Sequence, residues 1–598
     1  MSKELLAQAT TPRFADLTWT SATMPVYPAI PQDFAVGGIL PAIFYLFRRG
    51  VRRGTGHFHK TYRSGSAVTI SSILEVLACG VAEQANGQAA RFVEFRDELR
   101  KEVLGDLLLA HTLENRRRSE SKAEEVIRVY PSHFFASWVD LPVKVANLRW
   151  VPEMVVALLA EQDLADALQP CDQGPFPIAK KPQENLMLRP FHRGVIFGDN
   201  PSQLSGDQFD EKHGLSVDEL LSVAIGLGCG QAPEQSRSLS GKDSSGIPSR
   251  RPLSSRATRI FRDDLKTFLE QFADAVPRRA LTPMLESLIG LGVWHSFQSS
   301  LRCVVQWERS YAVPSQEKQL PHPVFVDASG GLERDLQLAS EESMDGVLRL
   351  LDEATVAMAC VRILDAEVWG FPEMAARCPV HADGQAWLDL LGRVRSRTEE
   401  DSEYVLYSIR KHCANLQRVL TETASSPEVS ALLSSPMARE DPTKALADAL
   451  CQMMGEKLLQ SFYLKFVDSA GMVNEPYGLV RKRRVRRTLS DGTIRRKEAR
   501  SVVLSNELLE ALVHTLLAQH NLRLSYAEFL WLLRDRYGLF VDEAPPEMSI
   551  DRELLLLNRA LLESRLRDLG LLTTVNDAES MKLLRPRYRA SSNNGHEG

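Results

Sequence analysis

The chain has 598 residues, with 72 Lys and Arg against 77 Asp and Glu, so its formal net charge is −5. This length exceeds what one hydrophobic core supports and predicts several domains of ~100 to 200 residues each. The longest apolar run, 39–47, is far shorter than the ~20 residues that a membrane helix requires, and the N-terminus lacks the apolar segment of a secretory signal. These features exclude a membrane-spanning protein, and we expect a cytoplasmic one.

The eight cysteines follow no regular spacing, and no CxxC motif occurs. This pattern is typical of reduced, buried thiols in a reducing compartment. The nearest approach to a metal motif is the pair Cys378 and His381 with the pair His412 and Cys413. A zinc site would require the fold to bring both pairs together, whereas a loop cysteine and a helix-surface histidine need no such coincidence. We therefore expect no metal and no cofactor.

The N-terminal part of the chain predicts helices. Residues 1–32 are rich in Thr and Pro and predict an irregular arm, and 33–229 predict a helical N-terminal domain. Within it, 48–67 interleaves Gly and basic residues with Phe58 and Tyr62, which predicts a basic loop. The residues expected to contact nucleic acid from this loop are Arg48, Arg49, Arg52, Arg53, Lys60 and Arg63. Helical spacing then puts Ile70, Ile73, Leu74, Leu77 and Val81 on one face.

The middle of the chain predicts a linker followed by more helices. Residues 230–256 are mostly Ser, Gly and Pro, a composition that cannot bury enough surface to offset chain entropy, so they predict a linker or long loop. Helical periodicity then predicts a helical middle domain over 257–470. Its segment PVFVDASGG predicts one strand and a turn. Asp327 in this segment is either the strand-end aspartate of a metal or phosphoryl site, or the cap of the turn.

The densest positive charge lies at 481–500, where ten basic residues accompany two acids. Val485, Leu489, Ile494 and Val502 alternate with these charges as in strands, and Asp491-Gly492 favours a type I′ turn. The pattern predicts a basic β-hairpin over 471–504. The residues expected to bind DNA phosphates are Arg481, Lys482, Arg483, Arg484, Arg486, Arg487, Arg495, Arg496 and Lys497.

Residues 505–590 predict three helices and a second hairpin. Ser505 opens the first helix, and Ser525 with Glu528 forms the capping box of the second, which Gly538 ends. The third helix follows Ser549 and stops at Gly570, and two short apolar runs then flank Asn576-Asp577. This order predicts a winged helix-turn-helix, followed by a disordered tail at 591–598.

In such a module the third helix buries one face and offers the other to a partner, normally the DNA major groove. We expect Leu554, Leu557 and Leu561 on the buried side. Arg552 and Arg559 are expected on the opposite side with help from Arg565. Lys582 and Arg585 would contact phosphates from the wing.

Two segments come close to catalytic motifs. Residues 54–61 depart from the phosphate-binding loop because His59 replaces its second glycine. Asp199, Asp210 and Lys212 loosely match a metal-dependent nuclease, but no apolar strand carries them. No Ser-His-Asp elbow and no dinucleotide fingerprint occur, so we expect no catalytic residue, and the sequence favours a protein that is not an enzyme.

Several stretches resemble proteins of bacterial multi-gene anti-phage defence clusters, without pointing to one family. They are 135–154, 299–331, 338–346, 504–513, 529–538 and 565–572. Such clusters also encode helicases, ATPases and DNA modification enzymes. The resemblance implies a subunit of a DNA-targeting complex.

Together these features predict a mainly α-helical, multidomain protein that binds double-stranded DNA as a non-catalytic accessory subunit and has protein partners. The alternative is a protein–protein interaction scaffold whose winged helix docks other subunits. A second alternative is a cryptic metal-dependent nuclease.

Overall fold

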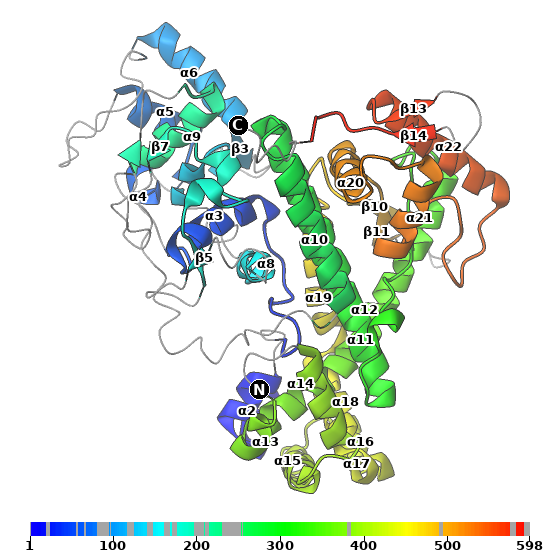
Figure 1. Cartoon of the computed structure of the whole chain (residues 1–598). Coiled ribbons are helices and arrows are strands. Elements are labelled where there is room, and N and C mark those ends of the chain that lie inside the picture. The colour runs from blue at the N-terminus through cyan, green and yellow to red at the C-terminus, as the bar shows by residue number, and fades with distance from the viewer. Residues whose placement is uncertain are drawn as a thin grey trace. The chain divides into compact units, whose positions relative to one another are not determined.

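The computed structural model describes residues 2–19, 24–54, 58–64, 67–79, 95, 97–115, 125–139, 148–160, 168–169, 176–196, 208–209, 214–229, 253, 255–378, 384–488, 494–574 and 582–590. The chain forms two compact units (Figure 1). Unit 1 comprises 1–33, 245–265 and 287–587, and unit 2 comprises 34–244, 266–286 and 588–598. Helices dominate both units, so the predicted mainly α class is confirmed. The predicted linker lies almost entirely outside the described residues.

Unit 2 combines short helices with two-stranded antiparallel pairs. Its helices are α3 (Ile39–Arg49), α4 (Phe58–Tyr62), α5 (Ile70–Cys79), α6 (Glu98–His111), α8 (Val151–Leu159) and α9 (Val217–Gly228), with short 3-10 turns at Val36–Gly38, Phe134–Trp138, Pro182–Glu184 and Arg189–Phe191. Its strands are β1 (Arg63–Ser64), β2 (Ala67–Val68), β3 (Thr112–Asn115), β4 (Glu125–Val129), β5 (Leu168–Gln169), β6 (Ile178–Ala179), β7 (Val195–Ile196) and β8 (Gln208–Phe209).

The predicted apolar face of α5 lies against the core of unit 2. Ile73 and Leu77 are buried there, and Ile70 and Leu74 pack against the same cluster. Val81 lies outside the described residues. The helical spacing thus located the buried side of α5 correctly.

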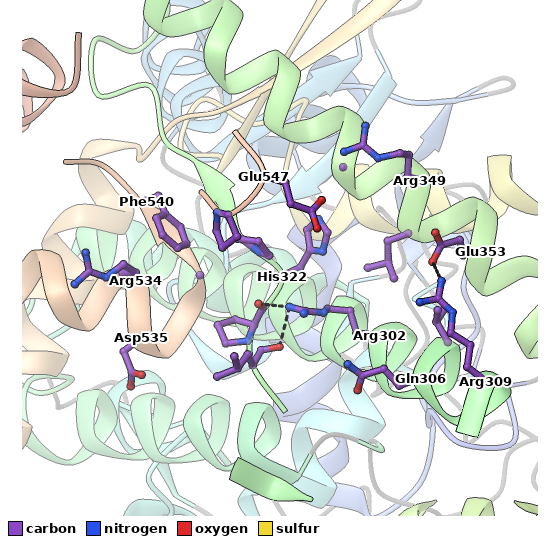
Figure 2. Close-up of a pocket in the computed structure, with 18 of the residues that line it drawn as sticks. Arg302, Gln306, Arg309, His322, Arg349, Glu353, Arg534, Asp535, Phe540 and Glu547 are labelled. Atoms are coloured by element: carbon purple, nitrogen blue, oxygen red, sulfur yellow. Dashed lines mark hydrogen bonds and ion pairs between the residues drawn. The ribbon is translucent and has the colours of Figure 1, made fainter. Parts of the chain in front are cut away.

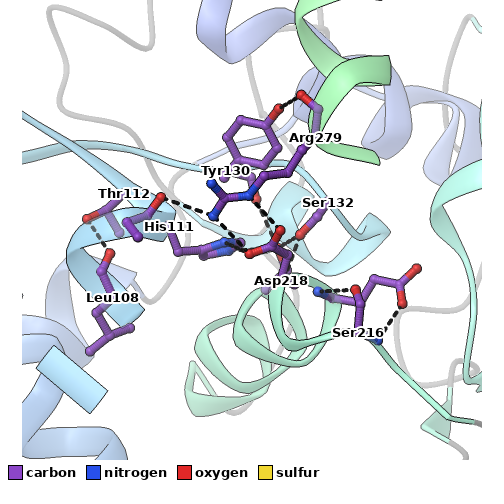
Figure 3. A network of polar contacts seen from close by, with 11 residues as sticks. Leu108, His111, Thr112, Tyr130, Ser132, Ser216, Asp218 and Arg279 are labelled. Atoms are coloured by element: carbon purple, nitrogen blue, oxygen red, sulfur yellow. Dashed lines mark hydrogen bonds and ion pairs between the residues drawn. The ribbon is translucent and has the colours of Figure 1, made fainter. Parts of the chain in front are cut away.

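A polar network within unit 2 ties the start of α9 to the end of β4 and to the first turn of the helix α11 (Arg278–Ser310) (Figure 3). The Arg279 guanidinium donates two hydrogen bonds to Asp218, at 2.7 and 3.1 Å. Tyr130 donates its hydroxyl to the Arg279 carbonyl at 2.7 Å, and His111 Nε2 lies 3.2 Å from Ser222 Oγ. Because these partners come from distant parts of the chain, the network joins them into one unit.

Unit 1 is built around two long helices, α11 (Arg278–Ser310), whose first turns belong to unit 2, and α12 (Arg334–Val368). Its other helices are α1 (Ser2–Ala9), α2 (Pro12–Thr18), α10 (Ser255–Gln271), α13 (Pro372–Ala376), α14 (Gly384–Arg395), α15 (Ser402–Glu422), α16 (Pro427–Leu433), α17 (Pro436–Glu440), α18 (Pro442–Met454), α19 (Glu456–Ala470), α20 (Asn506–Gln519), α21 (Tyr526–Tyr537) and α22 (Arg552–Asp568), with a 3-10 turn at Gln316–Lys318. The end of α10, from residue 266 on, belongs to unit 2. Helix α12 packs against α2, α18, α19 and β11, so it forms the centre of this unit.

The strands of unit 1 are β9 (Val324–Phe325), β10 (Val480–Thr488), β11 (Ile494–Val502), β12 (Leu539–Phe540), β13 (Leu572–Thr574) and β14 (Lys582–Leu584). β9 pairs in parallel with β12, and Val326 forms a bridge with Val502 of β11. Three segments that are distant in sequence therefore meet beside α12.

Residues 2–9 and 12–18 are helical, so the predicted irregular arm is wrong there, whereas 24–32 contain neither helix nor strand. The Thr11 side chain accepts a hydrogen bond from the Phe14 amide and caps α2. Leu6 and Phe14 are buried, and α1 packs on α15 while α2 packs on α12. Short helices are marginal alone and depend on such packing, which composition does not reveal.

The C-terminal part of unit 1 follows the predicted order of elements. The capping box of Ser525 and Glu528 is formed, and Gly538 ends α21 in a left-handed conformation. Helix α22 begins one residue after Asp551, and Gly570 beyond its end is also left-handed. β13 and β14 form an antiparallel pair. Their connection, with Asn576 and Asp577, lies outside the described residues, as does the predicted tail.

Candidate nucleic-acid interface

The strands β10 and β11 form a long antiparallel ribbon. Its register runs from Val480 opposite Val502 to Thr488 opposite Ile494. The predicted basic hairpin is therefore present, although its strands occupy less than the predicted 471–504. Asp491 and Gly492 lie outside the described residues, so the type I′ turn stays a prediction.

The root of the hairpin is anchored to the interior of unit 1. Val480 and Val502 are buried. The Val502 amide donates to Ser340 Oγ of α12 at 2.8 Å, and Ser340 donates to the Phe325 carbonyl of β9 at 2.7 Å. These contacts hold the root in place, so the charged part of the ribbon extends from a rigid support.

Acidic side chains neutralise the basic residues near this root. Arg483 Nη2 donates to Glu341 of α12 at 2.8 Å. Arg500, which is 7% exposed, binds both oxygens of Asp468 of α19, at 2.5 and 2.8 Å. Lys482 lies 3.8 Å from the same carboxylate. These three cations at the root have a carboxylate close by, while Arg481 donates to the Gly330 carbonyl, so acids offset most of the charge there.

Farther from the root, two arginines of the described residues lack this compensation. Arg484 and Arg486 are exposed, and no carboxylate among the described residues forms an ion pair with either. The backbone register sets Arg486 opposite Arg496 and Arg487 opposite Arg495. The side chains of Arg487, Arg495, Arg496 and Lys497 are outside the description. Like charges at directly opposed positions destabilise a β-ribbon, so this end of the hairpin favours an anionic partner.

A hollow of about 540 Å³ lies beside the root of the hairpin. Arg481 of this hollow donates to the Gly330 carbonyl, and Lys482 and Arg483 line it too. The remaining lining residues are Gln337, Val473, Asn474, Glu475, Pro476 and Ser501. Three of the predicted phosphate-binding residues thus border one concave surface with amide and hydroxyl donors.

Asp327 precedes the turn whose Gly330 carbonyl accepts the hydrogen bond from Arg481, and its contacts decide between the two predicted roles. Its carboxylate, fully buried, accepts hydrogen bonds from the Ser329 amide at 2.9 Å, the Ser329 hydroxyl at 2.5 Å and the Gly331 amide at 2.7 Å. These bonds occupy both carboxylate oxygens. Asp327 therefore caps the turn.

The predicted DNA-binding residues after the hairpin differ in their environments. Arg552 is exposed at the start of α22, whereas the Arg559 guanidinium lies 5.9 Å from the Tyr526 ring centre. Arg565 donates to the carbonyls of Ala328 and Leu504, Lys582 pairs with Glu563 at 2.9 Å, and Arg585 donates to the Gly570 carbonyl at 2.7 Å. Of these five, Arg552 is the best placed to meet a partner.

The buried side of α22 differs from the prediction. Asn558, Leu562 and Leu566 are buried, whereas Leu557 is 41% exposed and Leu554 and Leu561 are only partly covered. The prediction that Leu557 is buried was wrong. Four consecutive leucines precede Asn558, so their spacing does not indicate which side of the helix is buried. The deeply buried position is a polar residue that bonds main-chain groups.

The predicted basic loop of unit 2 is also corrected. Arg48 and Arg49 end helix α3 and are each 1% exposed, so they do not reach a surface ligand. Arg52 pairs with Glu153 at 2.7 Å and stacks on Trp150, and Arg53 donates to the Ser137 and Val139 carbonyls. Lys60 and Arg63 remain exposed.

Few of the catalytic candidates can be placed. Asp199, Asp210 and Lys212 lie outside the described residues, as does His381 of the possible zinc site. Ser222, His111 and Asp218 have the residue types of a hydrolytic triad. Ser222, however, is fully buried and donates its hydroxyl to the Tyr130 carbonyl at 2.9 Å. It lies within hydrogen-bond distance of His111 and Ser132, which Figure 3 labels, and it does not reach a substrate.

Comparison with known proteins identifies the family. A model of the methylation-associated defense system protein MAD7 matches residues 42–588. The chain belongs to the MAD7 family. The match includes the hairpin and the three C-terminal helices, and it confirms the resemblance to proteins of defence clusters. No curated protein and no solved structure matches the chain.

Two further features of this MAD7 family chain bear on partners. Within the described ranges, every helix is too short or too polar to cross a bilayer. In the same ranges, His, Cys, Asp and Glu side chains form no cluster suited to a metal ion.

Sequence analysis missed the acids that define the interface. Glu341 lies 142 residues before Arg483, which it binds, and Asp468 lies 32 residues before its partner Arg500. No spacing rule connects residues so far apart. That Arg483 and Arg500 have acidic partners, whereas Arg484 and Arg486 have none among the described residues, therefore emerges only from the fold.

Proposed function

We propose that this MAD7 family chain binds double-stranded DNA as a non-catalytic accessory subunit of a methylation-associated defense system, together with protein partners. The observation that carries the proposal is the distribution of charge along β10 and β11. Acids offset most of the charge at the root, while Arg484 and Arg486 have no such partner among the described residues. A two-stranded ribbon fits the major groove of B-DNA, and guanidinium groups bind phosphates strongly.

The C-terminal elements support the same proposal. Helices α20, α21 and α22 are followed by β13–β14, and Ser525 before α21 forms a bridge with Leu583 of β14. We assign this arrangement to a winged helix. In the proposed complex Arg552 contacts DNA from α22, and Lys60 and Arg63 of unit 2 are candidates for a second contact.

Fluorescence anisotropy of a labelled duplex tests the proposal with the double variant Arg484→Ser, Arg486→Ser. Wild type is expected to bind with a steep negative dependence of log K on log salt. The variant should bind more weakly, with a slope shallower by about two, since each lost phosphate contact removes roughly 0.9. Both residues are exposed, so the fold should persist.

The matched control is Lys411→Ser, Arg418→Ser, which removes the same charge from exposed positions on α15. It should leave the slope unchanged. Equal losses in both variants would mean that net charge, not the hairpin, governs binding. No binding by wild type even at low salt would contradict the DNA proposal.

One observation favours the alternative of an interaction scaffold. Leu556 and Leu557 of α22 are 55% and 41% exposed on a helix proposed to face DNA. Large apolar side chains on an exposed helix face are typical of protein interfaces. If duplex DNA fails to displace a bound subunit and Leu556→Ser releases it, the winged helix is a docking module.

The nuclease alternative rests on Asp199, Asp210 and Lys212. It requires that Asp199→Asn and Asp210→Asn abolish defence against phage while the protein stays folded. Retained defence in both variants would eliminate it.

A further inference from the structure

A second concave surface of unit 1 lies among α11, α12 and α21 (Figure 2). Its volume is about 560 Å³, within the usual range of small-molecule sites. The walls carry several arginines, one histidine and exposed aromatic surface. The lining residues are Arg302, Val305, Gln306, Arg309, Leu320, Pro321, His322, Pro323, Gly346, Arg349, Leu350, Glu353, Trp531, Arg534, Asp535, Gly538, Phe540, Pro546 and Glu547.

Some of these charges are already paired. Arg309 binds Glu353 at 3.0 Å, and Arg534 binds Glu543. Asp535 accepts from Arg256 at 2.9 Å. These pairs shape the walls and leave little charge for a ligand.

Arg302 and Arg349, unlike Arg309 and Arg534, form no ion pair with a carboxylate of the described residues. Arg302 donates to the carbonyls of Leu320 at 3.2 Å and Pro321 at 2.5 Å, which fix its guanidinium without cancelling its charge. Arg349 is exposed, and within the described part of the chain no carboxylate forms an ion pair with it. Two arginines of this cavity therefore retain attraction for an anion.

His322 and Gly346 define where that anion would lie. A Cβ atom at Gly346 would be 3.5 Å from His322 Nε2 and 3.6 Å from Arg349 Nη2, so both nitrogens border the space that this glycine leaves open. Burial, and then the charges of Arg302 and Arg349, lowers the pKa of His322 to about 3. The neutral imidazole can donate one hydrogen bond.

The rest of the cavity offers an aromatic surface and one opposing charge. Trp531, which is 52% exposed, lines it together with Phe540. Glu547, drawn beside His322 in Figure 2, is exposed and adopts a left-handed backbone with φ 71°. Its carboxylate would repel an anion and compete for Arg302.

We propose that this cavity binds a nucleotide, with its phosphate near His322 and Arg349, in the field of Arg302, and its base against Trp531. Planar guanidinium groups suit phosphate, and an indole ring stacks on any base. The ligand is either a free mononucleotide or a nucleotide of a nucleic-acid strand, since both present the same phosphate and ring. This site is separate from the hairpin and does not depend on it.

Isothermal titration of the full-length protein tests the site with deoxyadenosine 5′-monophosphate, deoxyadenosine, inorganic phosphate, and a short single strand with and without a 5′-phosphate. The nucleotide or the 5′-phosphorylated strand should bind more tightly than its counterpart without phosphate. Arg349→Ser should weaken this binding about tenfold, the usual effect of one charge-assisted hydrogen bond. Glu547→Gln should strengthen it. The exposed Arg418→Ser is the matched control and should change nothing.

These titrations distinguish a free mononucleotide from a nucleic-acid strand as the ligand, and they also show whether the proposal is wrong. Binding of the free nucleotide identifies a mononucleotide site, and binding of the phosphorylated strand alone identifies a strand site. Equal binding with and without phosphate, binding of inorganic phosphate as tight as the nucleotide, or no effect of Arg349→Ser would overturn the proposal. The hairpin variant Arg484→Ser, Arg486→Ser should keep nucleotide binding intact, so failure of the DNA proposal would not be mistaken for failure of this one.

Discussion

At the scale of single residues, buried polar side chains join segments that are distant in sequence. Asn558 of α22 is the clearest case. Its amide donates to the Val326 and Val541 carbonyls at 2.8 and 2.9 Å, and its oxygen accepts from the Ala328 amide at 2.9 Å. Because Asn558 is fully buried, no water replaces these bonds. The residue therefore fixes α22 against the segment that follows β9.

Asn558→Ala should reduce the free energy of unfolding by about 2 to 5 kcal/mol, because three buried main-chain groups lose their partner. Urea denaturation followed by circular dichroism measures this loss. Ser564→Ala, at an exposed position of the same helix, is the control and should change stability by less than about 0.5 kcal/mol. A loss for Asn558→Ala no larger than that of the control would show that the three bonds contribute nothing net.

Asp264 is a second buried link. It accepts from Tyr537 at 2.5 Å and from Gln519 at 3.0 Å, and it pairs with Arg536 at 2.5 Å. Burial raises the pKa of its carboxyl group, so the ionised form depends on these three donors. Asp264→Ala would leave the Arg536 charge without its partner in a largely buried place.

We expect Asp264→Ala to cost about 3 to 5 kcal/mol of unfolding free energy, as for other broken buried pairs. Asp263→Ala, one residue earlier and exposed, provides the comparison. Thermal unfolding measures both. Similar midpoints for the two variants would contradict a structural role for Asp264.

At the scale of elements, the two ends of the basic hairpin differ in what stabilises them. Acids and buried valines stabilise the root, whereas repulsion between opposed arginines destabilises the outer part. Amide hydrogens at the root, in 480–483 and 499–502, should exchange slowly. Those of 485–488 and 494–497 should exchange faster, because arginine stands opposite arginine there.

Adding duplex DNA, or sulfate as a simple anion, should slow exchange in the outer part of the hairpin and leave the root unchanged. Hydrogen exchange followed by mass spectrometry measures both regions in one experiment. Asp468→Asn is a useful variant because it removes an acid that binds Arg500 and Lys482. It should speed exchange at the root. Uniform exchange along the hairpin, with no response to anions, would refute this account of its charges.

At the scale of the whole molecule, buried histidines make stability depend on pH. Burial is the main cause that lowers the pKa of His133, His295 and His322 to about 3 and of His514 to about 4, and it also lowers the pKa of His111 below its usual 6.5. Folded, these imidazoles stay neutral. Unfolded, each takes up a proton as the pH falls through about 6.5, which favours the unfolded chain.

The melting temperature should therefore fall between pH 7.5 and 5.5. Each histidine contributes at most about 1.4 kcal/mol per pH unit below 6.5. Asp264 and Glu510, whose pKa burial raises, act in the opposite direction, because the folded carboxyl groups take up their protons at a higher pH than the unfolded ones. Differential scanning calorimetry across this range is the measurement. A constant melting temperature would mean that these histidines are not buried as neutral groups.

Several elements of this protein could be predicted from the sequence because they depend on near neighbours. Alternating Val and Arg, the capping box of Ser525 and the glycine stop at Gly538 act within a few residues, and the structure contains the strands and helix that they predict. The family match then agrees with the resemblance seen in several stretches. The sequence by itself thus determined the helical class, the basic ribbon and the order of the C-terminal elements.

Only the tertiary structure decided which charges are available to a partner. The arginines at 48 and 49 look like a surface cluster in sequence, but they end an apolar helix that is buried on all sides. The acids near the hairpin root come from helices far from it in the sequence. The walls of the cavity around His322 likewise come from segments up to some hundreds of residues apart. Charge is local in sequence, whereas its compensation depends on distances in space, and these are set by the packing of the long helices.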